Sequence, residues 1–239
     1  MTLTLATTAQ QAGYLLVNEL FGPTFQGEGP SAGQRAAFLR LADCNLACAW
    51  CDSRHSWDWR RHDQAAETRR VTVETVAAQL LALGTDLVVI TGGEPLLQAE
   101  AVTDLATLLR AAGRCIEVET NGTIPPPSQL TDLIERYNVS PKLRNAGLGS
   151  RPIDAAALTA FVTSGKAVFK FVACGADDAA QIAALQDAYG LHPVWVMPQA
   201  TSPEEVVSGM RQLADTALEH SWNLTSRLHI LLWGDQRGR

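Results

Sequence analysis

The sequence has no run of about 18 consecutive apolar residues, so it lacks a candidate membrane-spanning helix. Its first residues, MTLTLATTAQQAG, lack a basic segment followed by an apolar one, so we expect no export signal and a cytoplasmic protein. Basic residues are not in excess, since 19 Lys and Arg face 25 Asp and Glu and the formal net charge is −6. This balance argues against a broad surface for nucleic acid or anionic membranes.

Cysteine is scarce, with five residues in the chain, and three of them are clustered between positions 44 and 51. Such clustering differs from the paired cysteines of a secreted disulfide framework and indicates a metal site in a reducing compartment. Cys115 and Cys174 stand alone in apolar segments. We expect both of them to be small, buried core residues.

Short apolar runs alternate with helical patterns and no linker interrupts them, so we expect a single domain over residues 1–239. Helical periodicity is predicted over 73–81, 105–112, 182–188 and 206–218. About six strand–helix units predict an α/β fold, an open partial (β/α)6 barrel with parallel strands. The predicted strands are Ala36–Leu41, Asp86–Ile90, Cys115–Glu119, Tyr137–Ser140, Ala167–Val172 and Val194–Met197, with Leu228–Trp233 as a candidate seventh.

The segment CNLACAWCD, residues 44–52, places three cysteines directly after the first of these strands. In parallel α/β folds the chemistry lies at this end of the strands. Structural zinc takes four ligands, usually as two separated pairs, and no second C-x-x-C exists, although Asp52, His55 or His62 could supply a fourth ligand. A [4Fe–4S] cluster normally takes four thiolates, so three would leave one iron open to an outside ligand.

Cys44, Cys48 and Cys51, with Trp50 before the last of them, resemble the C-x3-C-x2-C motif of the radical S-adenosylmethionine (SAM) superfamily. The resemblance implies a [4Fe–4S] cluster whose open iron binds SAM and whose electron cleaves SAM to a 5′-deoxyadenosyl radical. TGGEP, residues 91–95, follows the next predicted strand. Its glycines permit close backbone approach, and its oxygens suit the SAM ammonium group.

The longer segment FQGEGPSAGQRAAFLRLADCNLACAWCDS resembles the 7-carboxy-7-deazaguanine synthase family. The resemblance continues through ETNGT (119–123), SPK (140–142), KFV (170–172), VMPQ (196–199) and the ending LLWGDQRGR. It implies a ring-contracting carbon–nitrogen lyase of queuosine or other deazapurine biosynthesis. The substrate would be 6-carboxy-5,6,7,8-tetrahydropterin, ammonia would be lost, and SAM would be regenerated. The resemblance also implies Mg²⁺, a homodimer and an electron donor of the flavodoxin or ferredoxin type.

The family resemblance also implies which residues contact the substrate. Gln26 and Glu28 suit the donor-rich edge of a pterin. Arg40 lies within an apolar strand and needs a partner, for which a substrate carboxylate or a structural salt bridge are the alternatives. The implied substrate contacts are Phe25, Gln26, Gly27, Glu28, Arg40, Thr91 and, through the terminal carboxylate, Arg239.

A second group of residues is implied for SAM and Mg²⁺. Ser53 stands where the family usually has threonine, and it keeps the hydroxyl oxygen that Mg²⁺ prefers. The five histidines lack a ligand pattern, so we expect surface or satisfied core positions for them. The polar stretch 54–70 yields no structural prediction. The implied SAM contacts are Trp50, Cys51, Asp52, Gly93, Glu94, Glu119, Asn121, Ser140, Pro141, Lys142 and Gln199.

Two alternatives remain at this point. A radical SAM activase, which makes a glycyl radical on a partner protein, would share C-x3-C-x2-C without needing the Q-G-E-G and F-x-R elements. It would form deoxyadenosine only with its protein partner. A non-enzymatic zinc or cluster-binding module would instead be colourless if it held one zinc ion.

Overall fold

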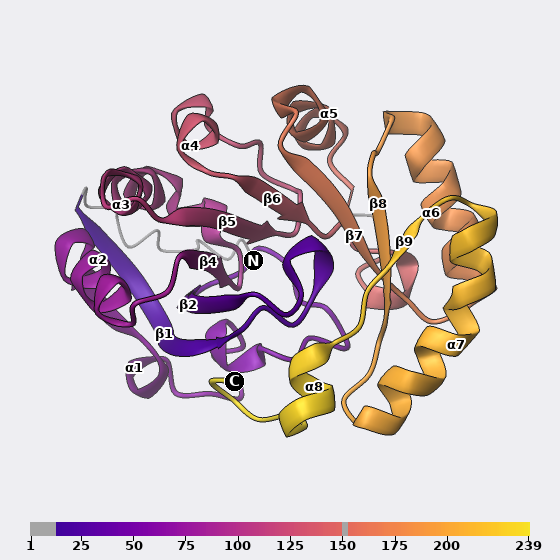
Figure 1. Cartoon of the computed structure of the whole chain (residues 1–239), viewed down its shortest axis with the longest axis horizontal. Helices are drawn as coiled ribbons and strands as arrows, with labels where there is room; N and C mark the ends of the chain where they lie inside the picture. The colour runs from indigo at the N-terminus through magenta and orange to yellow at the C-terminus, as the bar shows by residue number, and fades with distance from the viewer. Residues whose placement is uncertain (1–12, 150–152) are drawn as a thin grey trace, which may run out of the picture.

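The computed structural model describes residues 13–149 and 153–239, so the expectation about the first twelve residues lies outside it. The described residues form a nine-stranded sheet in the order β3-β1-β2-β4-β5-β6-β7-β8-β9 (Figure 1). The strands are β1 Tyr14–Phe25, β2 Arg35–Leu41, β3 Arg69–Thr72, β4 Leu87–Gly92, β5 Cys115–Thr120, β6 Arg136–Val139, β7 Ala167–Ala173, β8 Val194–Pro198 and β9 Asn223–Leu224.

Strands β2, β4, β5, β6, β7 and β8 pair in parallel with one another, which confirms the six predicted strands and the open α/β barrel. Their near-continuous apolar sequences fit this position, because a parallel sheet in such a fold is covered on both faces. Every residue of β7 is buried. The short β9 adds a parallel edge to β8.

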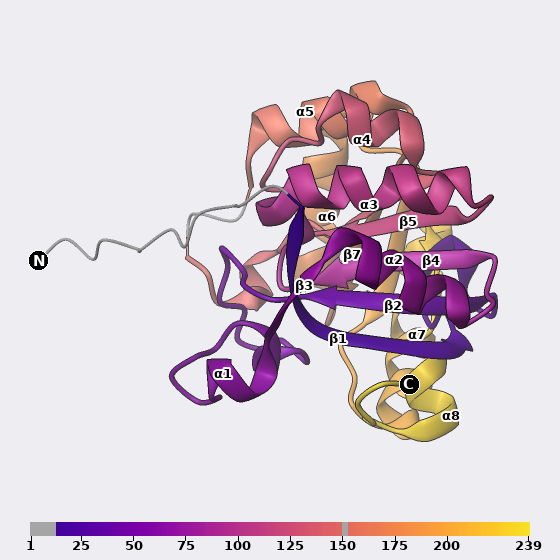
Figure 2. The ribbon, with the colours of Figure 1, turned by 90° about the vertical axis from the view of Figure 1, so that its left-hand side faces the viewer.

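Helices cover the outer, convex side of the curved sheet, as Figures 1 and 2 show. The helical periods predicted over 73–81, 105–112, 182–188 and 206–218 lie in or at the ends of α2, α3, α6 and α7, which confirms them. The helices are α1 Gln64–Glu67, α2 Val73–Ala82, α3 Ala99–Ala111, α4 Ser128–Leu133, α5 Ala155–Ser164, α6 Ala176–Tyr189, α7 Pro203–Glu219 and α8 Leu228–Trp233, with short 3-10 turns η1 Gly29–Ser31, η2 Arg54–Ser56, η3 Pro95–Gln98 and η4 Arg144–Ala146.

Three predictions about this architecture are wrong. The run 228–233 forms α8 and not a seventh strand, because a short apolar run has no periodicity that separates strand from helix. Its Ile230 packs with Ala200 and Val206 in a small separate core. Cys115 and Cys174 are both exposed. Cys115 begins β5 and Cys174 follows β7, so each lies at a strand end beyond the covered part of the sheet.

Two antiparallel strands at one edge were not predicted. β1 pairs with β2, with two register shifts along the pair, and it pairs with β3 on its other side. The stretch 54–70, which had no prediction, contains η2 and α1 and then enters β3. Together these segments form a wall beside the end of β2. No helix among residues 13–149 and 153–239 is long and apolar enough to cross a membrane.

Candidate active site

A cavity of about 360 Å³ opens where the parallel strands end, between the loops after β1 and β2 and the last residues of the chain. Glu94, Pro141 and Gln199 do not line it, although Gln199 lines an adjoining recess that shares Cys51 and Asp52 with it. The cavity brings together the predicted residues Phe25, Gln26, Gly27, Glu28, Arg40, Cys44, Cys48, Trp50, Cys51, Asp52, Ser53, Thr91, Gly93, Glu119, Asn121, Ser140, Lys142 and Arg239.

The three clustered cysteines face this cavity from the loop that follows β2. Two of their sulfur atoms accept hydrogen bonds from N–H groups. The Trp57 indole donates to Cys51 Sγ at 3.2 Å, and the Leu46 amide donates to Cys44 Sγ at 3.5 Å. Such donors stabilise thiolates that bind a metal, because they offset the negative charge on sulfur. The surroundings of the cysteines therefore fit an iron–sulfur cluster.

Burial affects the protonation of these thiols. It raises the pKa of the Cys44 thiol to about 12 and also raises the pKa of Cys48. Without a metal both sulfurs would keep their protons at neutral pH, whereas bound iron would favour the thiolates. Within the part of the chain that the structure describes, no three His, Cys, Asp or Glu side chains converge on one metal ion.

The TGGEP segment, which begins in the last two residues of β4, sets the position of the cysteine loop. The amide of Gly93 donates to Leu41 O at 3.0 Å, and the amide of Glu94 donates to Asp43 O at 2.8 Å. A Cβ atom on Gly93 would lie 2.1 Å from Asp43 O and 2.9 Å from the Cβ of Cys44. The backbone approaches so closely here that only glycine fits.

Replacing Gly93 by alanine should displace the backbone that carries Cys44, because the new methyl group meets main-chain atoms that cannot rotate away. We expect a loss of about 1–3 kcal/mol in the free energy of unfolding, together with reduced iron content after reconstitution. Urea unfolding and iron analysis measure the two effects. Gly175→Ala is the matched control, since its Cβ would meet nothing within 4 Å. Equal iron content in both variants would contradict the prediction.

Glu94 acts beneath the cavity and not on its surface. Its side chain is fully buried and accepts hydrogen bonds from the Leu96 amide at 3.0 Å, the Asn121 amide at 2.7 Å and the Thr120 hydroxyl at 2.8 Å. Burial raises its pKa despite these donors. These bonds tie the GGEP turn to the end of β5 and thereby place Asn121, which lines the cavity, at the wall near Cys44.

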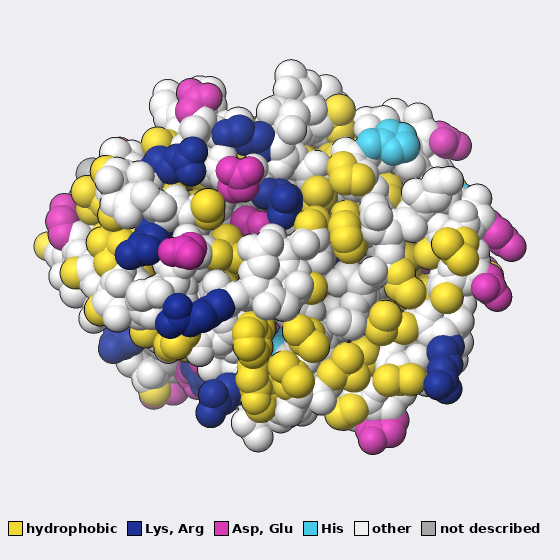
Figure 3. Space-filling model, viewed as in Figure 1, with side chains coloured by type: hydrophobic (Ala, Val, Ile, Leu, Met, Phe, Trp, Pro, Cys, Tyr) yellow, Lys and Arg dark blue, Asp and Glu magenta, His cyan; other side chains and the backbone are white. Residues whose placement is uncertain are grey.

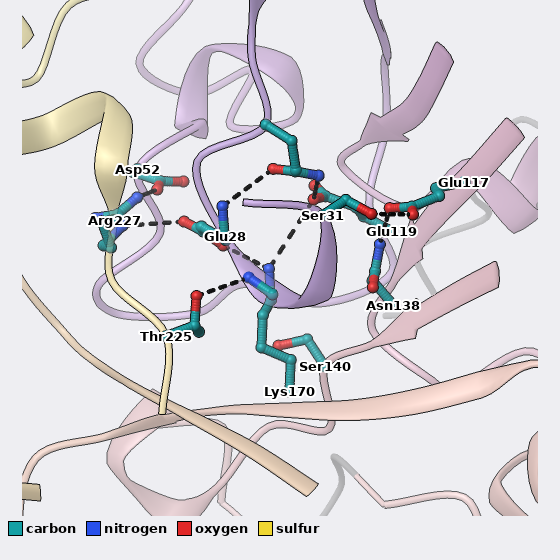
Figure 4. A network of polar contacts seen from close by, with 12 residues as sticks. Glu28, Ser31, Asp52, Glu117, Glu119, Asn138, Ser140, Lys170, Thr225 and Arg227 are labelled. Carbon is teal, nitrogen blue, oxygen red and sulfur yellow. Dashed lines mark hydrogen bonds and ion pairs between the residues drawn. The ribbon is translucent and has the colours of Figure 1, made fainter. Parts of the chain in front are cut away.

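A group of buried charges lies on the opposite wall (Figure 4). Lys170 of β7 donates from Nζ to Glu28 Oε2 at 2.5 Å. Arg227, which precedes α8, donates from Nε to Glu28 Oε1 at 3.1 Å and from its terminal nitrogen to Asp52. Burial alone would raise the pKa of Glu28, but the Lys170 and Arg227 cations outweigh burial and hold it well below its usual range. Glu28 is therefore an anion.

Gln26 is oriented by the same group. Its side-chain amide donates from Nε2 to Glu119 Oε1 at 3.2 Å, and its Oε1 accepts from the Glu28 amide at 3.2 Å. Gly27 between them has no room for a side chain, since a Cβ there would lie 2.1 Å from His229 Nδ1. The Gln26–Glu28 segment is thus fixed from three sides before any ligand binds.

Arg40 lies on a third wall and has a protein partner. Its Nε donates to Glu19 Oε2 at 3.1 Å, while its side chain remains 21% exposed and lines the cavity. Glu19 also contacts His55 at 3.3 Å and Arg237, and Arg237 binds Glu67 at 2.6 Å. Glu19 thus joins β1, the 54–70 stretch and the C-terminal tail next to the cavity.

The stability of the fold should depend on pH through Glu19. Partial burial raises its pKa, but His55, Arg237 and Arg40 together lower it from 4.5 to about 2. The unfolded chain therefore binds more protons between these values, so this stabilisation is present above pH 4.5 and is lost as the pH falls toward 2. Between pH 4.5 and 2, the free energy of unfolding measured in urea should fall more steeply with decreasing pH in the wild-type protein than in Glu19→Gln. We expect the two slopes to differ by about 1.4 kcal/mol per pH unit. The exposed Glu100→Gln is the control, and equal slopes in both variants would contradict the prediction.

Three of the residues predicted to contact SAM, namely Trp50, Ser140 and Lys142, lie together at the cavity between the cysteine loop and the end of β6. Lys142 Nζ donates to Ser140 Oγ at 2.8 Å and stands 5.4 Å from the centre of the Trp50 ring. Trp50 is held by its indole N–H, which donates to Asn145 Oδ1 at 3.2 Å. A cation and an indole face here adjoin the sulfurs of the cysteine loop. This arrangement suits a ligand with both a carboxylate and an aromatic part.

The side chains that line the cavity but were not predicted as site residues include Glu19, Lys170, Arg227 and His229. Lys170 stands in the KFV motif, so a signal was present, but no role followed from it. Arg227 directly precedes the segment Leu228–Trp233 that was predicted as a strand, and His229 lies within it. His229, expected at the surface or in the core, instead lies against Gly27, and burial lowers its pKa.

Comparison with known proteins agrees with this geometry. The sequence profile of the Radical SAM superfamily matches residues 41–142. The 7-carboxy-7-deazaguanine synthase of Pyrobaculum aerophilum is 40% identical over 227 residues, 93% of this chain and 96% of the relative. That of Hyperthermus butylicus is 33% identical over 229 residues, 91% of this chain and 92% of the relative. The crystal structure of QueE from Escherichia coli matches with a TM-score of 0.67 and 26% identity, covering 89% of this chain and 93% of that one. The chain belongs to the 7-carboxy-7-deazaguanine synthase family of the radical SAM superfamily.

Proposed function

We propose that this protein is a 7-carboxy-7-deazaguanine synthase, a carbon–nitrogen lyase that converts 6-carboxy-5,6,7,8-tetrahydropterin to 7-carboxy-7-deazaguanine with loss of ammonia. The observation that carries the proposal is the 40% identity across 93% of the chain to a relative of that name. The cavity supports it, because the cysteine motif and the Gln26–Glu28 segment line the same space. The activase alternative is not favoured, because the curated relatives reported above are named 7-carboxy-7-deazaguanine synthases. The product would be used in the biosynthesis of queuosine or of another deazapurine.

Cys44, Cys48 and Cys51 would hold a [4Fe–4S] cluster, which supplies the electron for reductive cleavage of SAM when it is bound. Around it the chain provides acceptors and donors for SAM. Backbone oxygens near Gly93 would accept from its ammonium group, and Lys142 would pair with its carboxylate. The remaining residues proposed for SAM are Trp50, Asp52, Glu119, Asn121, Ser140, Pro141 and Gln199, while Glu94 would act indirectly by holding Asn121.

Glu119 is the member of this set with the clearest free acceptor. Its Oε1 accepts from Gln26 and lies 4.0 Å from Lys170 Nζ, and its side chain is 23% exposed at the cavity. A carboxylate offers about four acceptor positions, so some remain for a ligand. Ribose hydroxyl groups are donors of the required kind. We therefore keep Glu119 as a ribose contact.

The pterin would lie against the Gln26–Glu28 segment, with Phe25 and Thr91 at its sides. Arg40 uses Nε for Glu19, which leaves the two terminal nitrogens of its guanidinium group for the substrate carboxylate. The terminal carboxylate of Arg239 is a further proposed contact, since this residue lines the cavity. These residues bind and orient the substrate so that C6 faces the radical source.

Ser53 would contribute a hydroxyl oxygen to Mg²⁺. It is buried at the cavity wall, 3.6 Å from Cys51 Sγ. Mg²⁺ usually keeps several waters and takes one or two protein ligands, together with oxygens of the substrate. A single serine hydroxyl beside a substrate carboxylate meets that pattern. No larger protein cage is needed.

The remaining parts of the proposal concern assembly and supply. We propose a single functional unit over residues 1–239, a homodimer, a cytoplasmic location and a flavodoxin or ferredoxin-type electron donor. Figure 3 shows hydrophobic side chains gathered on the face that carries α8. Phe25 is 42% exposed and Leu232 is 50% exposed. Such exposed apolar side chains suit an interface between two copies.

Anaerobic turnover tests the function directly. The reconstituted protein would receive 6-carboxytetrahydropterin, SAM, Mg²⁺ and a strong reductant, and products would be identified by mass. We expect 7-carboxy-7-deazaguanine in large molar excess over the SAM that is lost. SAM cleavage without this product would remove the proposed substrate and bring the activase alternative forward. A colourless protein with one bound zinc ion would contradict both the synthase proposal and the activase alternative.

A further inference from the structure

Lys170 is a buried cation at the wall of the cavity. Only 6% of the residue is exposed, and its ammonium group lies 2.5 Å from Glu28 Oε2 and 4.0 Å from Glu119 Oε1. Burial alone would lower its pKa, but the two carboxylates outweigh burial and raise it. Lysine is almost never so deeply buried without a partner. The pair with Glu28 is therefore a built feature of the cavity.

Arg227 approaches the same carboxylate from the other side. Arg227 is only 6% exposed. Each of the three nitrogens of its guanidinium group donates to a different segment of the chain. Nε donates to Glu28 Oε1 at 3.1 Å, one terminal nitrogen donates to Ala200 O at 2.5 Å, and the other donates to Asp52. Figure 4 shows Glu28 between this guanidinium group and the Lys170 ammonium group. Each oxygen of Glu28 thus has its own cation.

These contacts decide what Glu28 can bind. An ionised carboxylate has about four acceptor positions and no donor, so two positions remain after the two cations are satisfied. The side chain of Glu28 is 13% exposed and lines the cavity. Its two oxygens cannot rotate, because each is fixed by a charged partner. The cavity therefore presents a rigid pair of acceptors to a ligand.

We propose that Lys170 and Arg227 are specificity-determining positioning residues, which hold Glu28 as a fixed anion that accepts two adjacent N–H donors of a 2-amino-4-oxopyrimidine ring. This inference rests on the proposed function, since the pterin substrate carries that ring. The N3–H and the 2-amino group of a pterin are two such adjacent donors. A 2-oxo ring presents a carbonyl oxygen in place of the amino group, so an acceptor with partial negative charge would face the carboxylate.

A role in stability alone would not account for this placement. Replacing a buried ion pair by apolar residues is often neutral or stabilising, so such pairs are weak devices for stability. A site built to hydrogen-bond a donor discriminates strongly against the analogue that lacks it, because its polar groups are then left unpaired. Lys170 and Arg227 lie where they serve that discrimination, at the cavity and on either side of Glu28.

Equilibrium dialysis of two stable probes, 6-carboxypterin and 6-carboxylumazine, tests the inference on cluster-loaded protein with SAM and without reductant. The lumazine has oxygen in place of the 2-amino group. We expect the wild-type protein to bind the pterin about 10- to 100-fold more tightly than the lumazine, the size of one charge-assisted hydrogen bond. Lys170→Met should lower this ratio to within about threefold of unity. Lys170→Arg keeps the charge and should keep most of the ratio.

The ratio separates the possible outcomes. If a folded Lys170→Met protein binds both probes more weakly by the same factor, the ratio of affinities is unchanged. Lys170 would then have only a structural role, and the inference would be overturned. Wild-type protein that binds neither probe would overturn the proposed function itself and the inference with it. If Lys170→Met does not fold, the double variant with Glu28→Gln removes one positive and one negative charge together and so leaves the net charge of the wall unchanged. It should fold without discriminating between the probes, and a retained ratio there would also overturn the inference.

Discussion

Replacing Cys48 by alanine should abolish SAM cleavage and leave the fold nearly unchanged. Cys48 is one of the three proposed cluster ligands, and the remaining two cannot keep the same cluster with one open iron. The side chain itself is small, so its loss creates little cavity and should cost about 1 kcal/mol in the free energy of unfolding of the metal-free protein. Deoxyadenosine formed under reducing conditions, measured by mass, should fall to background.

Cys115→Ala is the matched control for this prediction. Cys115 is exposed at the start of β5, at the opposite end of the strand from the cavity. The Cys115→Ala protein should keep both the iron content and the SAM cleavage of the wild-type protein. Deoxyadenosine formation by Cys48→Ala at more than a few per cent of the wild-type rate would rule out the cluster assignment.

Replacing Arg40 by glutamine should lower kcat/KM for the carboxylated pterin by about 10²–10³-fold, since a charge-assisted contact with the substrate carboxylate is lost. The change would also leave Glu19 with fewer partners, but His55 and Arg237 remain beside it. We therefore expect only a modest effect on the free energy of unfolding, about 1 kcal/mol. Steady-state kinetics and urea unfolding separate the two effects.

The same experiment decides between the two interpretations of Arg40. If the salt bridge with Glu19 were its whole role, kcat/KM would stay within about threefold of the wild-type value and only stability would fall. Arg35→Gln is the control on the same strand. Arg35 is exposed and its guanidinium group donates to Gly84 O at 2.9 Å, away from the cavity. It should leave kcat/KM unchanged.

Local patterns predicted the framework because they act over few residues. The six parallel strands are apolar runs bounded by turns, and the Cys44–Cys51 motif and the Gly93 turn each lie within one short segment. The order of strands then places their ends, and the motifs that follow them, at one edge of the sheet. The gathering of these motifs in one cavity followed from the sequence in this way, although their individual roles remain proposals.

The sequence failed where a residue's environment is set from far away. Leu228–Trp233 reads equally well as strand or helix, and its packing against Val206 decided for a helix. Cys115 has apolar neighbours in sequence, yet its place at a strand end exposes it. β1 carries no clean alternation of buried and exposed residues, because two register shifts interrupt its pairing with β2.

By itself, the sequence determined the parallel sheet, the cysteine loop with its glycine-rich turn, and the family. Only the tertiary structure decided the charges around Glu28, since Lys170 lies 142 positions and Arg227 lies 199 positions further along the chain. Contacts at such separations leave no periodicity or spacing in the sequence. They exist because β7 and the segment before α8 meet the loop after β1, and a buried carboxylate there is stable only with cations beside it.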